Sequence, residues 1–285
     1  MVFVFIAGVL WGTIGLFVNT MARLGASPSQ ICTLRMFFAF AIMSLLAFAR
    51  NGRRALHLDR RTLLVCALLG LVSHGAFNIC YTASIRINGM GIACVLMYTA
   101  PVFTAIASWI CFHERFSPLK VIALIVNIAG CILTVTGGDF SGADLNMWGL
   151  LAGLGSGFGY GMAAIFGRMA GERTDPFTMS AYSYFFAMVF LYGMLRPELT
   201  LDAKILGTGF VYGLVPTSLA YVLYYTGIKR ISDTGRVPVI ASIEPVTAII
   251  LGMLVYGEKI GSANMIGVAV VLISIILIIK AHGAS

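Results

Sequence analysis

Charged residues are scarce in this chain. Asp, Glu, Lys and Arg make up only 11% of its 285 residues, whereas about a quarter of the residues of a soluble domain are charged. Long apolar runs stand in their place, since 59% of the residues are hydrophobic. The composition therefore excludes an ordinary soluble enzyme, a secreted disulfide scaffold and a disordered tail. It predicts an all-α polytopic membrane protein.

Motifs for catalysis and metal binding are missing as well. His113-Glu114 is not followed by the second histidine of an HExxH zinc site, and Ser156 lacks the flanking glycines of a GxSxG nucleophile. The six cysteines form no CxxC pair, so neither a zinc site nor a disulfide framework is indicated. We therefore predict no enzymatic activity, no catalytic residue, no metal site and no cofactor.

The apolar runs divide the chain into ten segments, each long enough to cross a membrane as a helix. A helix needs roughly 20 apolar residues to cross the hydrocarbon, and it satisfies every backbone polar group within itself. The runs are continuous and lack the alternation of barrel strands. The predicted spans are 2–22, 29–49, 62–84, 89–112, 119–137, 147–168, 177–195, 205–228, 235–257 and 261–280.

The net charge of +8 is explained by topology, because the basic residues lie in short segments between the spans. With the N-terminus in the cytosol, thirteen Lys and Arg residues fall on the cytosolic side and five on the other, as the positive-inside rule requires. We expect both termini in the cytosol, the bacterial inner (plasma) membrane as the location, and no nucleic-acid partner.

The chain contains an internal repeat. Residues 81–116 align without gaps to 225–260, so that Pro101 matches Pro245 and Glu114 matches Glu258. The predicted halves, 1–137 and 147–280, hold five spans each. Because five is odd, the second half must be inverted relative to the first, an architecture typical of secondary transporters.

These features resemble a known family, the drug/metabolite transporter superfamily in its ten-span form with two EamA-type repeats. The residues that carry the resemblance are Trp11-Gly12, Arg35, Pro101, Pro245, Glu114 and Glu258. The second half departs from the pattern, with Ser156-Gly157 in place of Trp-Gly and Ser183 at the position of Arg35. The resemblance implies a central cavity between the halves and export of amino acids or other metabolites.

Polar and aromatic residues at helical spacing predict the lining of that cavity. His74, Asn78 and Tyr81 share one face of the third span, and Thr217, Tyr221 and Tyr225 repeat this spacing in the eighth. The predicted lining residues are Trp11, His74, Asn78, Met97, Tyr98, Tyr221, Tyr225, Ser242 and Glu244.

Two charged residues fall inside predicted spans. A carboxylate near the bilayer centre must face protein or water, so Glu244 either binds a substrate amine or proton, or is a structural group beside Pro245. Arg35 pairs with a substrate carboxylate, reaches Glu244 or extends to the membrane surface, although its recurrence in the family favours a structural role. Glu244 and His74 are the candidates for proton coupling, since both are titratable groups deep in the spans.

Small residues and prolines predict packing and gating positions. Gly153, Gly157 and Gly161 follow one another at four-residue spacing in the sixth span, which lets a neighbouring helix approach closely. Pro101 and Pro245 interrupt helical hydrogen bonding and admit bends, either as gates or as packing kinks.

The leading hypothesis is a gradient-driven exporter of amino acids or related amine-bearing or aromatic compounds. Its partners are then a small-molecule substrate, membrane lipids and, in a coupled mechanism, protons, and the protein is a monomer or homodimer. The alternatives are an importer of an amine nutrient on the same scaffold and, in a different class, a membrane-embedded enzyme or lipid-binding scaffold.

Overall fold

A computed structural model describes residues 1–114, 117–139, 146–198, 202–257 and 261–280. Within these ranges the chain is helical and contains no strand. Ten helical segments there are long and apolar enough to span a membrane, which confirms the predicted all-α, ten-span fold. The segments are Val2–Arg23, Pro28–Asn51, Arg60–Asn88, Met90–Phe112, Pro118–Thr136, Met147–Gly171, Pro176–Leu195, Ala203–Ile228, Thr234–Tyr256 and Ser262–Lys280.

Five of these spans are single α-helices and five are interrupted. The continuous spans are α3 (Pro28–Asn51), α8 (Pro118–Thr136), α9 (Met147–Gly171), α10 (Pro176–Leu195) and α15 (Ser262–Lys280). The interrupted spans are built from α1 (Val2–Gly12) and α2 (Ile14–Arg23); α4 (Arg60–Leu68), η2 (Leu69–Ala76) and α5 (Phe77–Asn88); α6 (Met90–Met97) and α7 (Ala100–Phe112); α11 (Ala203–Tyr212), η3 (Gly213–Leu219) and α12 (Ala220–Ile228); and η4 (Thr234–Arg236), α13 (Val237–Ala241) and α14 (Ile243–Tyr256). A short helix, η1 (Gly52–Leu56), follows α3.

Polar residues set the starts of several spans. The side chains of Ser27, Ser117 and Asp175 accept hydrogen bonds from backbone N–H groups of the first turn, and a proline follows each of them. The cap satisfies a donor that has no partner inside the helix, and proline at the first helical position needs none. These helix starts are therefore encoded locally.

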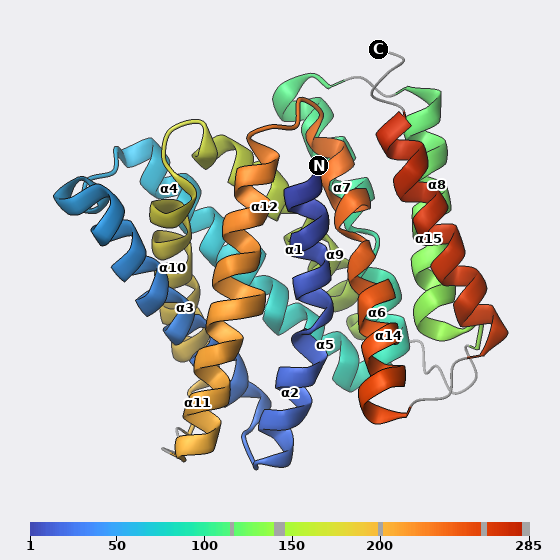
Figure 1. The fold of residues 1–285 in the computed structure, drawn as a ribbon, viewed down its shortest axis with the longest axis horizontal. Helices are drawn as coiled ribbons and strands as arrows, with labels where there is room; N and C mark the ends of the chain where they lie inside the picture. Colours follow the sequence, from blue (N-terminus) through green and yellow to red (C-terminus); the bar gives the residue numbers. More distant parts are fainter. Residues whose placement is uncertain (115–116, 140–145, 199–201, 258–260, 281–285) are drawn as a thin grey trace.

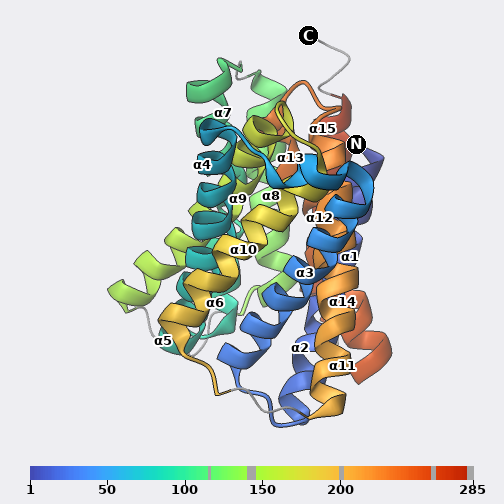
Figure 2. The same ribbon diagram turned by 90° about the vertical axis from the view of Figure 1, so that its left-hand side faces the viewer.

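The helices pair in a pattern that repeats between the two halves (Figure 1). Helix α9 packs against α5, α6 and α7 of the first half, just as α1 packs against α12, α13 and α14 of the second. Helices α8 and α15 pack together at one side of the bundle, and α3 and α10 at the other, where Figure 2 shows them side by side. The first helix begins and the last helix ends at the same end of the bundle. This is the arrangement of two inverted five-helix repeats, with a boundary that we propose to lie between residues 137 and 147.

The interruptions also fall at matching positions. The wide π-helical turns of η2 and η3 are separated by the same offset that relates 81–116 to 225–260. Span 4 breaks at Tyr98 and Thr99, and span 9 breaks at Ser242, the counterpart of Tyr98. Pro101 and Pro245 lie in the first turn of the helix that follows each break. Backbone N–H groups of a first turn have no acceptor within the helix, so a proline at this position removes no helical hydrogen bond. Each break therefore lies before its proline.

Glycines allow a close helix contact at each break. A Cβ atom added to Gly157 of α9 would lie 2.7 Å from the carbonyl oxygen of Leu96, beside the break in span 4. A Cβ atom on Gly12 of α1 would lie 2.8 Å from the carbonyl oxygen of Glu244, beside the break in span 9. Gly153 and Gly161 are buried on the same helix as Gly157. The glycine spacing of span 6 is thus used for packing.

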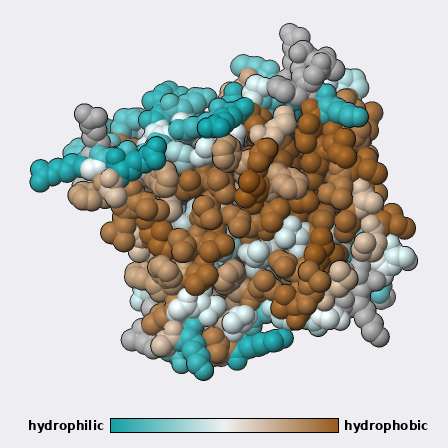
Figure 3. All heavy atoms as spheres, viewed as in Figure 1, coloured by the Kyte–Doolittle hydropathy of each residue, from teal (hydrophilic) through white to brown (hydrophobic). Residues whose placement is uncertain are grey.

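On the face that Figure 3 shows, apolar side chains form a broad band, and hydrophilic residues gather at the two ends. Large apolar residues such as Leu45, Trp148 and Leu254 are more than two-thirds exposed. Such a surface would aggregate in water but matches the hydrocarbon of a bilayer. The protein is therefore embedded in a membrane.

Candidate functional site

The centre of the bundle holds a cluster of aromatic side chains, here called the aromatic cluster: Trp11, His74, Tyr160, Tyr221 and Tyr224. The ring centroid of Trp11 lies 4.9 Å from those of Tyr221 and Tyr224 and 6.0 Å from that of Tyr160. The ring of His74 meets Tyr221 edge to face at 4.7 Å. The cluster therefore joins α1 and α12 to η2 and α9, across the two halves.

Glu244 lies at the edge of the aromatic cluster. The Tyr160 hydroxyl donates a hydrogen bond of 2.7 Å to its Oε2 atom. Glu244 stands in the first turn of α14, directly after the break in span 9, and its side chain is half-buried. Within the described part of the chain it forms no ion pair, so its carboxylate is held there by a neutral partner.

His74 of the aromatic cluster forms a buried pair with Tyr225, and 3.4 Å separate the His74 Nε2 atom from the Tyr225 hydroxyl. Asn78, one turn further on, donates to the His74 carbonyl oxygen and accepts from the Cys32 thiol of α3 at 3.7 Å. The polar groups of this face of span 3 are therefore used in contacts between helices.

Met97, Tyr98 and Ser242 make other contacts. Met97 and Tyr98 pack in an apolar cluster with residues of α14, and Tyr160 of the aromatic cluster packs against it. The Ser242 hydroxyl contacts Asn127 of α8 at 2.5 Å. The match between Tyr98 and Ser242 in the repeat thus does not bring both side chains to the same surface.

Arg35 is buried in α3, with a relative exposure of 7%. Its Nε atom donates to the Thr217 hydroxyl at 3.1 Å, and its Nη1 atom donates to the Tyr212 hydroxyl at 3.3 Å. The guanidinium also lies over the ring of Tyr212, 5.2 Å from the centroid. It neither extends to the membrane surface nor forms an ion pair with Glu244.

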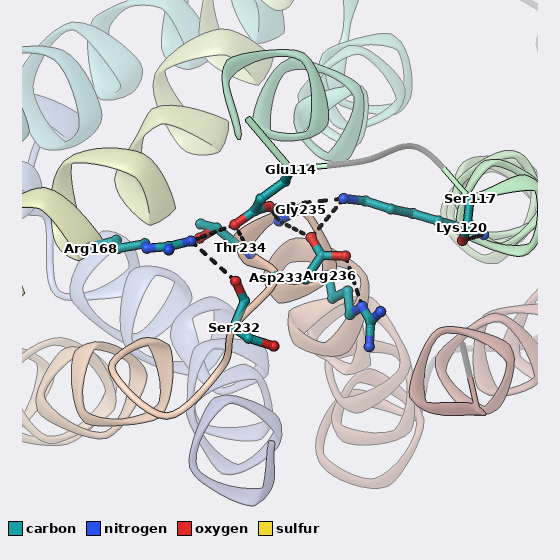
Figure 4. A network of polar contacts seen from close by, with 9 residues as sticks. All are labelled: Glu114, Ser117, Lys120, Arg168, Ser232, Asp233, Thr234, Gly235 and Arg236. Atoms are coloured by element: carbon teal, nitrogen blue, oxygen red, sulfur yellow. Dashed lines mark hydrogen bonds and ion pairs between the residues drawn. The ribbon is translucent and has the colours of Figure 1, made fainter. Parts of the chain in front are cut away.

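A second polar site, here called the charge cluster, joins the segment after α7 to α8, α9 and the start of span 9 (Figure 4). It consists of Glu114, Lys120, Arg168, Asp233 and Arg236. The carboxylate of Glu114 binds Arg168 at the end of α9 and accepts hydrogen bonds from the backbone N–H groups of Thr234 and Gly235 at 2.8 and 3.2 Å. Residues of both halves are therefore tied together here.

Asp233 extends the charge cluster towards α8. Its carboxylate binds Lys120 at 2.6 Å and Arg236 at 2.9 Å. Burial raises the pKa of Asp233, but the hydrogen bonds and positive charges of Lys120 and Arg236 outweigh burial and hold the pKa below its ordinary value. Asp233 is therefore ionised at neutral pH and remains a partner for both cations.

The opposite end of the bundle has a recess in place of such a cluster. A surface cavity of about 590 Å³ opens between α2 and α14 and is lined by Asn19, Ala22, Arg23 and Tyr256. The Arg23 guanidinium lies over the ring of Tyr256, 5.3 Å from its centroid. The two ends thus differ: one is bridged by ion pairs and the other is hollowed.

Tyr160, Tyr224 and the charge cluster were absent from the predicted site. Tyr160 lies among the glycines of span 6, which draw attention to packing. A usable signal was present, because Tyr160 is one turn from Ser156, the repeat counterpart of Trp11. Glu114 stands outside the spans in the sequence, so nothing local indicated that it meets the start of span 9.

The comparison with known families agrees with this architecture. The family model of the EamA-like transporter family matches residues 1–136 and 147–280, one match for each half of the bundle. The chain belongs to this family. It is therefore a transporter of small molecules of the EamA type, which confirms the resemblance seen in the sequence.

Relatives of this EamA-like transporter are themselves named as transporters. It is 26% identical to an uncharacterized transporter of Archaeoglobus fulgidus over 95% of this chain and 93% of that one. It is 26% identical to the threonine/homoserine exporter RhtA of Escherichia coli K12, over 82% of this chain and 76% of RhtA. A solved crystal structure superposes with a TM-score of 0.81 at 17% identity, covering 97% and 94% of the two chains. That likeness shows the fold alone.

Proposed function

We propose that this protein exports amino acids or related amine-bearing compounds by alternating access. The observation that carries the proposal is Glu244, a carboxylate in mid-span that Tyr160 alone of the described residues holds by a hydrogen bond, at the edge of the aromatic cluster. A carboxylate in this place attracts a cationic amine, and the aromatic rings favour cation–π and apolar contacts. RhtA, named as an amino-acid exporter, supports this substrate class.

We propose that the proton gradient supplies the energy and that proton exchange at Glu244 couples it to transport. A carboxylate that binds either a proton or a substrate amine couples the movement of one to the other. His74 is a second candidate, but its imidazole contacts only rings and the Tyr225 hydroxyl among the described residues. Glu244 is therefore the preferred coupling residue.

The proposed orientation places the charge cluster at the cytosolic end. The positive-inside asymmetry supports it, because η1 and the start of α4 carry basic residues at this end of the bundle. The closed charge cluster and the recess at the other end fit a state that is shut towards the cytosol. Uptake of an amine nutrient is the second candidate, since the same geometry serves either direction.

Transport in proteoliposomes tests the proposal. We expect the purified protein to exchange radiolabelled homoserine or threonine in counterflow, and to accumulate it against a pH gradient. Glu244→Gln should abolish the pH-driven accumulation and leave counterflow measurable, because counterflow needs no net proton movement. Glu198→Gln, at an exposed loop position, is the matched control and should behave like the wild type.

The outcomes separate the parts of the proposal. Unchanged accumulation by Glu244→Gln would exclude this residue as the coupling site and leave His74. Loss of both accumulation and counterflow would assign Glu244 to substrate binding or folding. Absence of counterflow for every amino acid tried would contradict the proposed substrate class.

A further inference from the structure

Arg35 is a buried cation whose contacts in the described part of the chain are neutral. Its guanidinium binds the hydroxyls of Thr217 and Tyr212, and none of the six ion pairs found there includes it. A charged side chain inside a membrane span is costly unless an opposite charge or water offsets it, and such residues commonly mark a substrate pathway. Among the described residues, Arg35 therefore has no opposite charge to offset its own.

Trp11 is a second donor without a protein acceptor. Its side chain is 3% exposed, and its buried Nε1 atom has no hydrogen-bond partner within the part of the chain that the structure describes. Buried indole N–H groups usually find an acceptor. The Trp11 ring packs against Tyr221 at 4.9 Å. Tyr221 lies one helical turn beyond Thr217, whose hydroxyl accepts from Arg35. Both donors thus approach neighbouring turns of span 8.

Glu244 supplies the opposite charge on the other side of the aromatic cluster. It interacts electrostatically with Arg35, yet the two do not form an ion pair. Tyr160 and Trp11 connect them, since Tyr160 binds Glu244 and its ring lies 6.0 Å from that of Trp11. The centre of the bundle therefore has a cationic side and an anionic side with aromatic rings between them.

We propose that Arg35 and the Trp11 indole N–H form a carboxylate subsite, so that the transporter recognises zwitterions by both ends. The guanidinium and indole donate to the substrate carboxylate, and Glu244 receives the amine. Arginine suits this role because its planar fork donates two parallel hydrogen bonds to one carboxylate. The inference rests on the proposed function and names the group that selects amino acids over simple amines.

Fluorescence of Trp11 tests the subsite without transport. The other two tryptophans, Trp109 and Trp148, are 55% and 75% exposed, so Trp109→Phe with Trp148→Phe leaves Trp11 as the only reporter. Three probes are titrated: homoserine, 4-hydroxybutyrate, which lacks the amine, and 3-amino-1-propanol, which lacks the carboxylate. We expect both carboxylates to change the Trp11 emission, and the amino alcohol to leave it unchanged.

Substitutions at Arg35 decide the outcome. Arg35→Met should weaken the response to both carboxylates by about ten- to hundredfold, the range of a hydrogen bond to a charged group. Arg35→Lys, which keeps the charge without the planar fork, should fall between, and it remains informative if Arg35→Met does not fold. Glu198→Gln, at an exposed loop position away from the subsite, should keep the response to homoserine.

Three results would overturn the subsite: no carboxylate response in the reporter protein, an equal response to the amino alcohol, or an unchanged response in both Arg35 variants. A failure of the proposed function is distinguishable. It would appear as absent homoserine counterflow in the wild type while the 4-hydroxybutyrate response persists.

Discussion

In the first half of the bundle, span 3 widens into η2 and span 4 breaks at Tyr98; in the second half, span 8 widens into η3 and span 9 breaks at Ser242. A glycine of the opposite half packs against each break, Gly157 in one case and Gly12 in the other. The backbone features that allow helices to bend and approach are therefore present twice.

The charged and aromatic side chains at the centre of the bundle are not repeated between the halves. Arg35 has Ser183 as its counterpart, Glu244 has Ala100, and Trp11 has Ser156. π-Helical turns and close small-residue contacts are typical of places where helices shift, whereas buried charges are typical of binding sites. Under the proposed function, we infer that the repeated features serve the motion of the halves and that the unrepeated ones serve the binding of the solute.

The largest expected effect tests the repeated part of this comparison. Gly157→Leu and Gly12→Leu should both prevent normal folding, because even a Cβ atom would lie within 3 Å of a backbone oxygen that cannot move aside. Overpacking typically costs about 1–3 kcal/mol, and contact with backbone places these variants at the upper end. The yield of monodisperse protein and its melting temperature measure the loss.

Gly193→Leu is the control, since no atom lies within 4 Å of the corresponding Cβ position in α10. It should express and melt like the wild type. If only one of the two glycine variants lowered yield and melting temperature, the two helix contacts would not be equivalent. That result would contradict the statement that the close contact at the break is present in both halves.

The sequence predicted the spans and the repeat well. The spans follow from the length of the apolar runs, and the repeat follows from the matching residues of 81–116 and 225–260. Helix starts such as Pro28 and Pro176 follow from local caps. The π turns of η2 and η3 could not be predicted, since Leu69–Ala76 is as apolar as an ordinary helix and its geometry comes from packing.

The candidate site was predicted in part. Trp11, His74, Tyr221 and Glu244 do come together, because helical spacing fixes which residues share a face. Ser242 was expected beside them on the strength of its match to Tyr98, but the helix break at this residue turns its hydroxyl towards Asn127. Contacts between distant segments, such as Tyr160 with Glu244, need the fold.

An intermediate effect is expected at the charge cluster. Glu114→Gln should destabilise the protein by about 1–3 kcal/mol, because the carboxylate is 9% exposed and its loss leaves Arg168 without its buried partner. Glu172→Gln is the matched control. It removes the other carboxylate of Arg168, which is 64% exposed and 3.7 Å away, and should change stability by about 0–1 kcal/mol.

Denaturation in detergent measures both charge-cluster variants, and equal losses would show that Glu114 is no more than a surface partner. The result also sharpens the comparison between the halves. Glu258, the repeat counterpart of Glu114, lies outside the described residues. A matching loss in Glu258→Gln would add this contact to the features that are present twice.

The smallest expected effect concerns the two prolines. Pro101 and Pro245 occupy the first turns of α7 and α14, where a backbone N–H has no helical acceptor. Pro101→Ala and Pro245→Ala therefore break no hydrogen bond, and each should cost only about 0.4–1 kcal/mol through the greater freedom of the unfolded chain. Because the two positions match in the repeat, the two losses should be equal within error, with counterflow of homoserine retained in both.

Paired melting curves and counterflow assays check this. A loss of transport confined to Pro245→Ala would show that this proline acts on its neighbour Glu244, and would move Pro245 from the repeated features to the unrepeated site.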